Sequence, residues 1–232
     1  MILGTAEVAP LSMAAAYATL ANGGVHCEPI ILESVTNKDG ESLAVPEAHC
    51  QRVLDEEVAH GVSYILQNVM TQGTGRPARM ADGRPQAGKT GTTQMAEAVW
   101  FAGYTPDMAG VAMIATDRGH EYWKNKTRKS ITRVPLANGG RLRGSGGGDA
   151  GLIWKAAMTS ALKDTPKTKF TAPTKKILEG EKVNVPSVRG MSYNEAKSTL
   201  EAAGFSTVRS QVYSDYRRGT FLGASPSDTA VK

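Results

Sequence analysis

A lysine followed by hydroxyl-bearing residues stands near the middle of this chain of 232 residues, in the run Lys89-Thr90-Gly91-Thr92-Thr93. On a strand, Thr90 and Thr92 point to the same face, where their hydroxyls can bind a carboxylate. Gly91 removes a side chain where a substrate must lie close to the backbone, and an amide of a strand edge can donate to an oxyanion. We therefore predict a site in which Lys89 supplies a catalytic positive charge and Thr90, Gly91, Thr92 and Thr93 bind substrate.

The same lysine belongs to a second motif, because residues 83–90 read GRPQAGKT and fit the phosphate-loop pattern G-x-x-x-x-G-K-[ST]. Residues 111–117 also resemble an apolar strand that ends in a magnesium-binding aspartate. A phosphate loop requires a buried strand before it and a helix after it, with the helix amides pointing at phosphate. Residues 75–82 are unsuited to a buried strand, and Gly91-Thr92-Thr93 opens a helix poorly. Nucleotide binding is therefore the less favoured alternative.

The elements around Lys89 are predicted to be strands. Residues 86–93, 98–105 and 109–117 have strand-like composition, and Thr105-Pro106-Asp107 separates the last two as a tight antiparallel connection would. The glycine-rich residues 144–148 are predicted to be a flexible joint.

Three helices are predicted to accompany these strands. The first covers residues 10–21, with Pro10 in its first turn and Gly23-Gly24 after its end. The second runs from an Asp55 cap to about residue 72, and the third covers residues 150–163. The spacing of apolar residues predicts a buried stripe on the second helix at Val58, Val62, Ile65, Leu66 and Val69, and one on the third at Leu152, Ile153, Ala156, Ala157, Ser160 and Ala161.

The two cysteines are predicted to form a disulfide. Asn37-Lys38-Asp39-Gly40 lies between apolar runs and predicts a hairpin turn, and Cys27 and Cys50 are equally distant from its centre. In a regular antiparallel register they are opposite each other, within reach of a disulfide. The alternative is a zinc site that also uses His26 and His49, which is disfavoured because adjacent strand residues point to opposite faces. We therefore predict no metal site, and no other pattern indicates a cofactor.

Positive charge is concentrated in residues 118–143, which hold eight basic residues and one acid, Glu121. A localised basic stretch indicates an anionic neighbour, such as a cell-wall polymer, more than a general coat for nucleic acid. A solvated loop is the alternative. We expect no nucleic-acid partner.

Composition sets the outer limits: 41% of the residues are apolar and 21% are charged, as in folded domains. No apolar run is long enough to cross a bilayer, and residues 1–7 do not read as a signal peptide.

Residues 164–182 are rich in Lys, Thr and Pro and are predicted to be a linker. A second unit follows, with a helix that begins at the capping box Ser192–Glu195, buries Ala196, Leu200 and Ala203, and ends at Gly204.

Several segments together resemble the transpeptidase domain of class A penicillin-binding proteins. They are residues 4–11 (GTAEVAPL), 16–24, 69–75 (VMTQGTG), 87–93 (AGKTGTT), 100–106 (WFAGYTP) and 151–158. Residues 183–190 (VNVPSVRG) and the helix after them resemble a PASTA domain. The resemblance implies a mixed α/β (α+β) fold, with an antiparallel sheet flanked by helices and a small α+β module. It divides the chain into a transpeptidase portion over residues 1–163, the linker, and a PASTA domain over residues 183–232.

The resemblance also implies a function, and it implies that this sequence lacks two of the family's catalytic motifs. Enzymes of this family carry S-x-x-K, S-x-N and K-T-G in that order, and neither of the first two precedes Lys89 here. The letters recur only later, at Ser160–Lys163 and Ser192–Asn194, which we interpret as coincidences. We therefore expect a piece of a bifunctional, actinobacterial-type cell-wall synthase that acts outside the cell membrane. Its partners would be D-Ala-D-Ala stem peptides and β-lactams. A non-catalytic wall-binding fragment is the alternative.

Overall fold

The computed structural model describes residues 6–117, 119–127, 129–227 and 229–231. The chain forms two compact units, Met1–Pro173 and Thr174–Lys232, and each is described by itself below. No helix within the described residues is long and apolar enough to cross a membrane.

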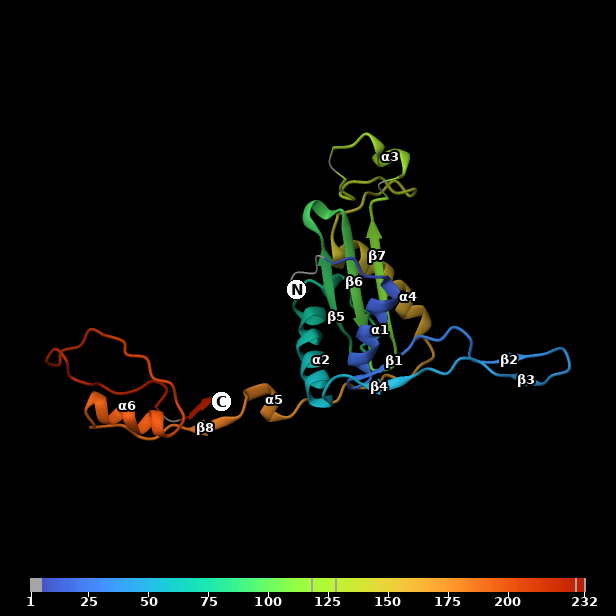
Figure 1. Ribbon diagram of the computed structural model, residues 1–232. Coiled ribbons are helices and arrows are strands. Elements are labelled where there is room, and N and C mark those ends of the chain that lie inside the picture. The colour runs from blue at the N-terminus through green and yellow to red at the C-terminus, as the bar shows by residue number, and fades with distance from the viewer. Residues whose placement is uncertain (1–5, 118, 128, 228, 232) are drawn as a thin grey trace. The chain divides into compact units, whose positions relative to one another are not determined.

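A three-stranded antiparallel sheet forms the centre of the first unit (Figure 1). Its strands are β5 (Ala87–Thr92), β6 (Ala98–Tyr104) and β7 (Ala109–Ala115), in the order β5-β6-β7. Between β6 and β7 the Thr105 amide donates to the Met108 carbonyl over 2.9 Å, and the Thr105 hydroxyl accepts the Asp107 amide over 3.2 Å. This closes the tight connection, and the three predicted strands are confirmed. In the described part of the chain, β5 pairs only with β6 and is an edge strand.

Helices cover both faces of this sheet (Figure 1). Helices α1 (Pro10–Ala21) and α2 (Glu56–Thr71) lie on one face, and α4 (Gly151–Ala161) lies on the other. Tyr104, at the end of β6, joins the first two: its ring meets Tyr17 of α1 edge-on at 5.9 Å, and its hydroxyl is 2.9 Å from that of Ser63 of α2. Burial raises the pKa of Tyr104 to about 12, so the phenol is neutral at ordinary pH. The helix bounds agree closely with those predicted.

The buried face of α4 differs from the prediction. Trp154 and Met158, together with Leu162 just beyond the helix, are buried, whereas Leu152 and Ile153 of the predicted stripe are about half exposed. The other members of that stripe, Ala156, Ala157, Ser160 and Ala161, are exposed. The indole of Trp154 packs against Phe101 at 5.0 Å between ring centroids and donates to the Gly103 carbonyl over 3.1 Å. One bulky ring that fits a glycine-lined surface therefore sets the rotation of the helix.

Helix α2 begins as predicted, because the Asp55 side chain accepts the Glu57 amide over 2.9 Å. Its buried residues, however, are Ala59, Gly61, Ser63 and Met70. Of the predicted stripe, Val58 and Ile65 are exposed, and Val62, Leu66 and Val69 are intermediate. Small side chains let this helix approach β5 closely, so its larger apolar residues are displaced toward its flanks.

A long hairpin leaves the first unit between α1 and α2 (Figure 1). At its base β1 (Val25–Cys27) pairs with β4 (Cys50–Arg52), and nearer its tip β2 (Val35–Thr36) pairs with β3 (Ser42–Leu43). We call residues 28–49 the hairpin arm. Cys27 lies opposite Cys50, and the two form a disulfide with 4.0 Å between their Cα atoms. The tip pairs Val35 with Leu43, which is offset by one residue from the base register. The ladder is interrupted between the two pairs, where Pro29 and Pro46 stand.

Replacing both cysteines, Cys27→Ser with Cys50→Ser, should lower the free energy of unfolding of the first unit by about 3 kcal/mol, because the disulfide closes a loop with a sequence separation of 23 residues. Urea denaturation followed by tryptophan fluorescence measures the change. A reducing agent should shift the wild-type midpoint and leave that of the double variant in place. Equal midpoints for the two proteins would mean that the arm opens without loosening the sheet.

Four short helical segments complete the described part of the first unit. They are η1 (Arg76–Ala78), η2 (Gln94–Ala96), α3 (Glu121–Lys124) and η3 (Gly146–Ala150). Part of the predicted linker also packs here: the Thr168 hydroxyl donates to the Asp107 carboxylate over 2.6 Å, and Phe170 meets the Tyr104 ring at 5.5 Å.

The second unit contains α5 (Lys175–Glu179), β8 (Lys182–Asn184), α6 (Tyr193–Ala202) and β9 (Thr229–Val231), with β8 and β9 antiparallel. The predicted capping box at Ser192 and Glu195 is confirmed. Ala196 and Leu200 are buried and Ala203 is exposed, because Ala203 is already the C-terminal cap of α6. Gly204 follows with φ +87°, the left-handed geometry expected at a helix end. The small core contains Val188, Ala196 and Leu200.

Candidate functional site

The strand β5 determines where each residue of the Lys-Thr-Gly run points. Lys89 lies opposite Ala102 of β6, while Thr90 and Thr92 lie opposite Phe101 and Val99. Phe101 and Val99 belong to the core that contains Trp154 of α4. Thr90 and Thr92 therefore share the α4 face of the sheet, and Lys89 lies on the face covered by α1 and α2.

Lys89 is exposed at the open edge of the sheet. Its ammonium donates to the carbonyl of Thr90 over 2.9 Å. Among the described residues, no carboxylate lies within ion-pair distance of it. An ammonium without a counter-charge at an open strand edge can attract an anionic ligand that lies along the strand.

Both threonine hydroxyls are held by residues distant in sequence. The Thr90 hydroxyl is 2.7 Å from that of Thr74, which follows α2. The Thr92 hydroxyl accepts the amide of Gly146 over 3.4 Å. The arrangement fixes the two hydroxyls on one side of the strand, where they can present a hydrogen-bond donor to a carboxylate.

The glycine-rich residues 144–148 pack tightly against the site, so the prediction of a flexible joint is wrong. Gly146, Gly147 and Gly148 are buried in η3. A β-carbon on Gly146 would lie 2.6 Å from the Trp100 carbonyl oxygen and 2.7 Å from that of Gly91, and one on Gly147 would lie 2.2 Å from that of Thr74. Glycine is needed here because two backbones approach each other, which composition alone does not reveal.

Thr93 has a different role from the two threonines before it. Its hydroxyl accepts the amide of Ala98 over 2.9 Å, and its own amide donates to the carbonyl of Ala98 over 3.0 Å. These bonds close the turn from β5 to β6. Inside the turn, Met95 and Ala96 have φ of 57° and 53°, which is unusual for residues other than glycine.

The segment that enters β5 is anchored by Arg84. Its guanidinium is buried, pairs with Asp82 over 2.6 Å and donates to the carbonyl of Leu162 over 2.7 Å at the end of α4. Burial acts to raise the pKa of Asp82, but the hydrogen bonds and charge of Arg84, with the charge of Lys167, lower it overall. Residues 83–90 are thus a clamped loop followed by a strand. Strand β5 continues through Thr90 to Thr92 instead of giving way to a helix at that point, which rules out the phosphate-loop geometry.

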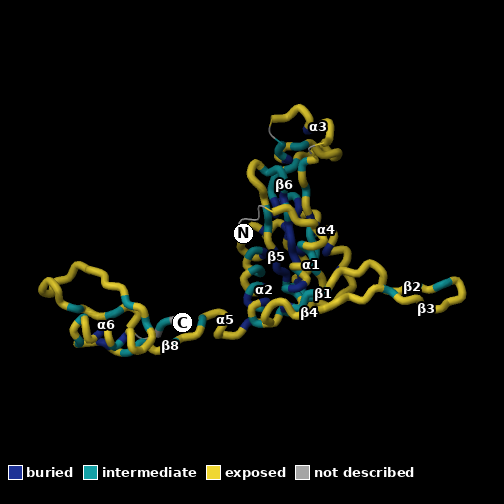
Figure 2. The backbone as a smooth tube through the Cα atoms, viewed as in Figure 1, coloured by how far each residue is buried: buried dark blue, intermediate teal, exposed yellow. Residues whose placement is uncertain are grey.

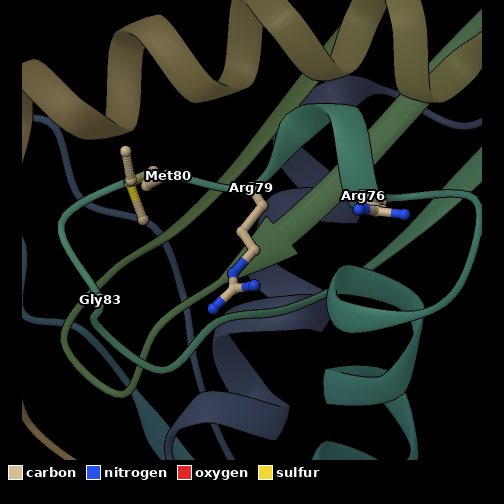
Figure 3. Close-up of a pocket in the computed structure, with 5 residues that line it drawn as sticks. Arg76, Arg79, Met80 and Gly83 are labelled. Atoms are coloured by element: carbon tan, nitrogen blue, oxygen red, sulfur yellow. The ribbon is translucent and has the colours of Figure 1, made fainter.

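A pocket of about 380 Å³ lies in the segment that leads into this loop, lined by Arg76, Arg79, Met80, Ala81 and Gly83 (Figure 3). Figure 3 shows the two guanidinium groups projecting from the loop away from each other. The pocket does not include Lys89 or the threonines. It therefore adds no chemistry to the strand edge.

The basic residues 118–143 leave the end of β7 and return beside the turn that follows β5. The Ile131 amide donates to the carbonyl of Ala96 over 3.0 Å, which fixes this return. Lys126 lies over the ring of Tyr122 at 3.4 Å and near that of Trp123 at 5.5 Å. Arg118 and Arg128 lie outside the described residues. The basic segment therefore meets the end of the Lys89 strand through the turn that follows β5.

Sequence reasoning missed Thr74, Gly146 and Arg84 as residues that shape the site. Thr74 and Gly146 are 16 and 54 positions from their partners. The nearest available signal was the presence of four glycines among residues 144–148 (GSGGG), which predicts flexibility when close packing is not considered. The letters at Ser192 also have a structural explanation, since this serine caps α6 in the second unit.

Comparison with known proteins gives two family matches. Residues 3–136 match the penicillin binding protein transpeptidase domain, and residues 183–232 match the PASTA domain. The chain is similar to penicillin-binding protein 1A of Mycolicibacterium smegmatis, at 34% identity over 75% of this chain and 21% of the relative. It is also similar to penicillin-binding protein 1A of Mycobacterium tuberculosis, at 30% identity over 75% of this chain and 20% of the relative. The chain thus spans about a fifth of the length of these relatives.

Solved structures show the same relation. The penicillin-binding protein PonA1 from Mycobacterium tuberculosis matches with a TM-score of 0.57 and 30% identity, over 72% of this chain and 41% of that one. Penicillin-binding protein 1A from Haemophilus influenzae matches with a TM-score of 0.55 and 21% identity, over 80% of this chain and 30% of that one. The second likeness concerns the fold alone.

Proposed function

Because this chain belongs to the penicillin-binding protein transpeptidase family and also contains a PASTA domain, we propose that its first unit supplies the Lys-Thr-Gly strand of a peptidoglycan D,D-transpeptidase. In the proposed reaction a serine hydroxyl attacks the D-Ala-D-Ala end of a stem peptide and releases D-alanine. The amine of a second stem then attacks the acyl-enzyme and forms the cross-link. Proton transfer and oxyanion stabilisation make both steps possible.

In this proposal Lys89, Thr90, Gly91 and Thr92 are this chain's share of the site, and Thr93 holds the turn beside it. The observation that carries the proposal is an edge strand whose outer side is unpaired in the described chain, with the Lys89 ammonium exposed on it. A stem peptide can lie along such an edge as an added strand. Its terminal carboxylate would then meet the threonine hydroxyls and the positive charge. Serine acyl transfer of this kind needs no metal or redox cofactor.

We propose that the protein acts outside the cell membrane, at the cell wall, as expected for peptidoglycan cross-linking. β-Lactams would be ligands of the same site, since they resemble the stem terminus. A second candidate function, binding to the wall without catalysis, is favoured by the absence of S-x-x-K before Lys89 in this sequence. Both functions use the same carboxylate site.

Titration of this chain with a D-Ala-D-Ala stem peptide, followed by amide NMR, tests the carboxylate site. We expect the amides of residues 89–92 to shift, with weaker binding in Lys89→Ala and Thr92→Val. Thr71→Val on α2 is the matched control, because its exposed hydroxyl contacts only its own helix. Shifts confined to residues 183–232 would instead assign stem binding to the PASTA domain.

We further propose that the basic residues 118–143 bind anionic wall polymers. Replacing Lys124, Lys126, Arg128 and Lys129 with glutamine should weaken such binding about tenfold at low ionic strength, since each of the four positive charges removed contributes a fraction of a kcal/mol. Salt should remove the difference, because screening shortens the range of these charges. Cosedimentation with purified anionic wall polymer at several salt concentrations measures both effects. Equal binding by the two proteins at low salt would mean that the segment is only a solvated loop.

A further inference from the structure

The hairpin arm carries a strong negative charge and exposed apolar side chains. Its 22 residues, 28–49, include five acids and one lysine, a net charge of −4. All five acids are exposed. The side chain of Ile31 is 92% exposed, and Leu32 and Leu43 are about half exposed. Figure 2 shows the arm almost wholly exposed, next to a sheet that is largely buried.

The arm is nevertheless held in a defined shape. The disulfide ties its two ends. At its tip the Asn37 side-chain oxygen accepts the amides of Asp39 and Glu41, each over 2.9 Å. A two-stranded ribbon is marginal by itself in water, and a cluster of exposed apolar side chains is typical of a docking surface. The arm is therefore a preorganised surface whose partner should be basic and partly apolar.

The same chain contains a surface of that kind, in the basic segment 118–143. Its net charge is +7, from eight basic residues and one acid. The described side chains of Lys124, Lys126, Arg133, Arg141 and Arg143 are exposed, and Tyr122 and Leu136 are about 40% exposed among them. Within the described residues, no ion pair joins an acid of the arm or a base of this segment to an opposite charge.

The arm and the basic segment lie at opposite ends of the sheet (Figure 1). Strand β6 runs from Ala98, beside the turn that contacts the basic segment, to Tyr104, which contacts Tyr17 and Ser63. The arm leaves at this second end, where the Val53 and Leu54 amides donate to the Gly24 carbonyl. One molecule therefore cannot bring its own arm onto its own basic segment, whereas two molecules can.

We propose that two copies of this chain associate antiparallel, with the hairpin arm of each docked on residues 118–143 of the other. A twofold pair forms two identical arm-to-segment contacts at the entropic cost of a single association. Ile31 and its neighbours cover apolar side chains of the segment, and the acids of the arm meet its lysines and arginines. Since the proposed wall polymer would use the same basic segment, polymer and second copy compete for it.

Analytical ultracentrifugation of the full chain tests the pairing. At low salt the weight-average mass should rise with concentration from 24.6 kDa toward twice that value, and 1 M salt, where the Debye length is about 3 Å, should weaken the association strongly. Ile31→Asp should raise the dissociation constant at least about tenfold, because it removes a large apolar contact and adds a like charge to the arm. The variant Lys163→Glu with Lys169→Glu changes exposed charges outside both surfaces and should leave the constant unchanged.

Charge variants on the two sides make the test specific for these two surfaces. Glu33→Lys with Glu47→Lys changes the net charge of the arm from −4 to 0, and Lys124→Glu with Lys126→Glu changes that of the segment from +7 to +3, so each variant alone should associate more weakly than the wild type. Their equimolar mixture contains one intact wild-type contact and should associate more strongly than either variant alone. A chain with all four changes keeps no wild-type contact and should be monomeric.

Three outcomes would overturn the proposal. The first is a monomer at every concentration and at low salt, and the second is association that is insensitive to both the arm and the segment variants. The third is a mass that grows beyond two copies, which would replace the twofold pair with an open head-to-tail chain. Circular dichroism of each variant shows whether it is folded, so that a loss of pairing is not mistaken for unfolding.

Discussion

Incubated with a fluorescent penicillin and separated under denaturing conditions, this chain should give no labelled band near 24.6 kDa. Opening a β-lactam needs an activated hydroxyl within hydrogen-bond reach of its base, together with oxyanion donors. The residues on β5 can place a carboxylate and supply positive charge. The hydroxyls of Thr90 and Thr92 are held by Thr74 and by the Gly146 amide. Among the described residues, no carboxylate or histidine forms a hydrogen bond with either hydroxyl, as a base would.

The expected level of labelling follows from the reaction rate that remains without a nucleophile. In a serine-protease triad, binding and oxyanion stabilisation alone leave about 10³–10⁴ over the rate in water, which is far below labelling on the time scale of the assay. The fluorescence of Lys89→Ala should therefore equal that of the wild type, since both are at background. The positive control is a fragment of a larger relative that carries S-x-x-K, which should become labelled in the same assay.

A labelled band would contradict this expectation and direct attention to Ser160 and Lys163. Ser160 lies in the last turns of α4 and is exposed, as is Lys163 beyond the helix. Ser160→Ala would then abolish the label if that serine were the nucleophile. If this variant lost the label but still bound stem peptide at β5, the labelled serine and the Lys-Thr-Gly strand would be two separate sites.

Local patterns predicted the elements of this fold well, because their signals lie within a few residues. The strands around Lys89 are bounded by a Thr-Pro-Asp connection, and α6 begins at a capping box that the structure contains. The disulfide partners follow from the position of one turn, even though the tip of the arm is offset by one residue. In each case the residues that decide the outcome are neighbours in the sequence.

The faces that the helices bury could not be predicted in this way. The spacing of Leu152 and Ile153 suits a buried stripe, yet Trp154 is the buried residue because Gly103 and Gly110 make room for its ring. A β-carbon on Gly103 would lie 2.8 Å from that ring. The shape of a partner 51 positions away decides the rotation, and no window of local sequence contains it.

The candidate site divides in the same manner. The Lys-Thr-Gly run is a local motif, and the alternation along β5 places Thr90 and Thr92 on one face, as expected for a strand. The supports of this run come from the loop after α2 and from η3. These supports depend on a close approach of two backbones, which is set by the tertiary structure. The only sign of it in the sequence is the presence of glycine.

Gly146→Ala tests that close approach and should be among the most destabilising single changes in the first unit. Gly146 does not have a positive φ, so alanine is compatible with its backbone conformation. Its β-carbon, however, would lie 2.6 Å from the Trp100 oxygen and 2.7 Å from the Gly91 oxygen. Both are backbone atoms of paired strands and cannot rotate away. Overpacking of this kind costs about 2–3 kcal/mol, which should lower Tm by about 5–10 °C for a unit of this size.

The neighbouring Gly148→Ala is the matched control. It lies in the same helical segment, and the atoms nearest to its β-carbon would be side-chain atoms of Ser145 at 3.3 Å and Arg143 at 3.5 Å. Since alanine also restricts the unfolded chain, this change should be neutral or slightly stabilising. Calorimetry measures Tm for both variants, and amide exchange at residues 90–92 measures the local effect. If Gly146→Ala kept the wild-type Tm and exchange rates, η3 would not be packed on β5 in solution. The hydroxyl of Thr92 would then lack the amide partner that orients it toward a substrate carboxylate.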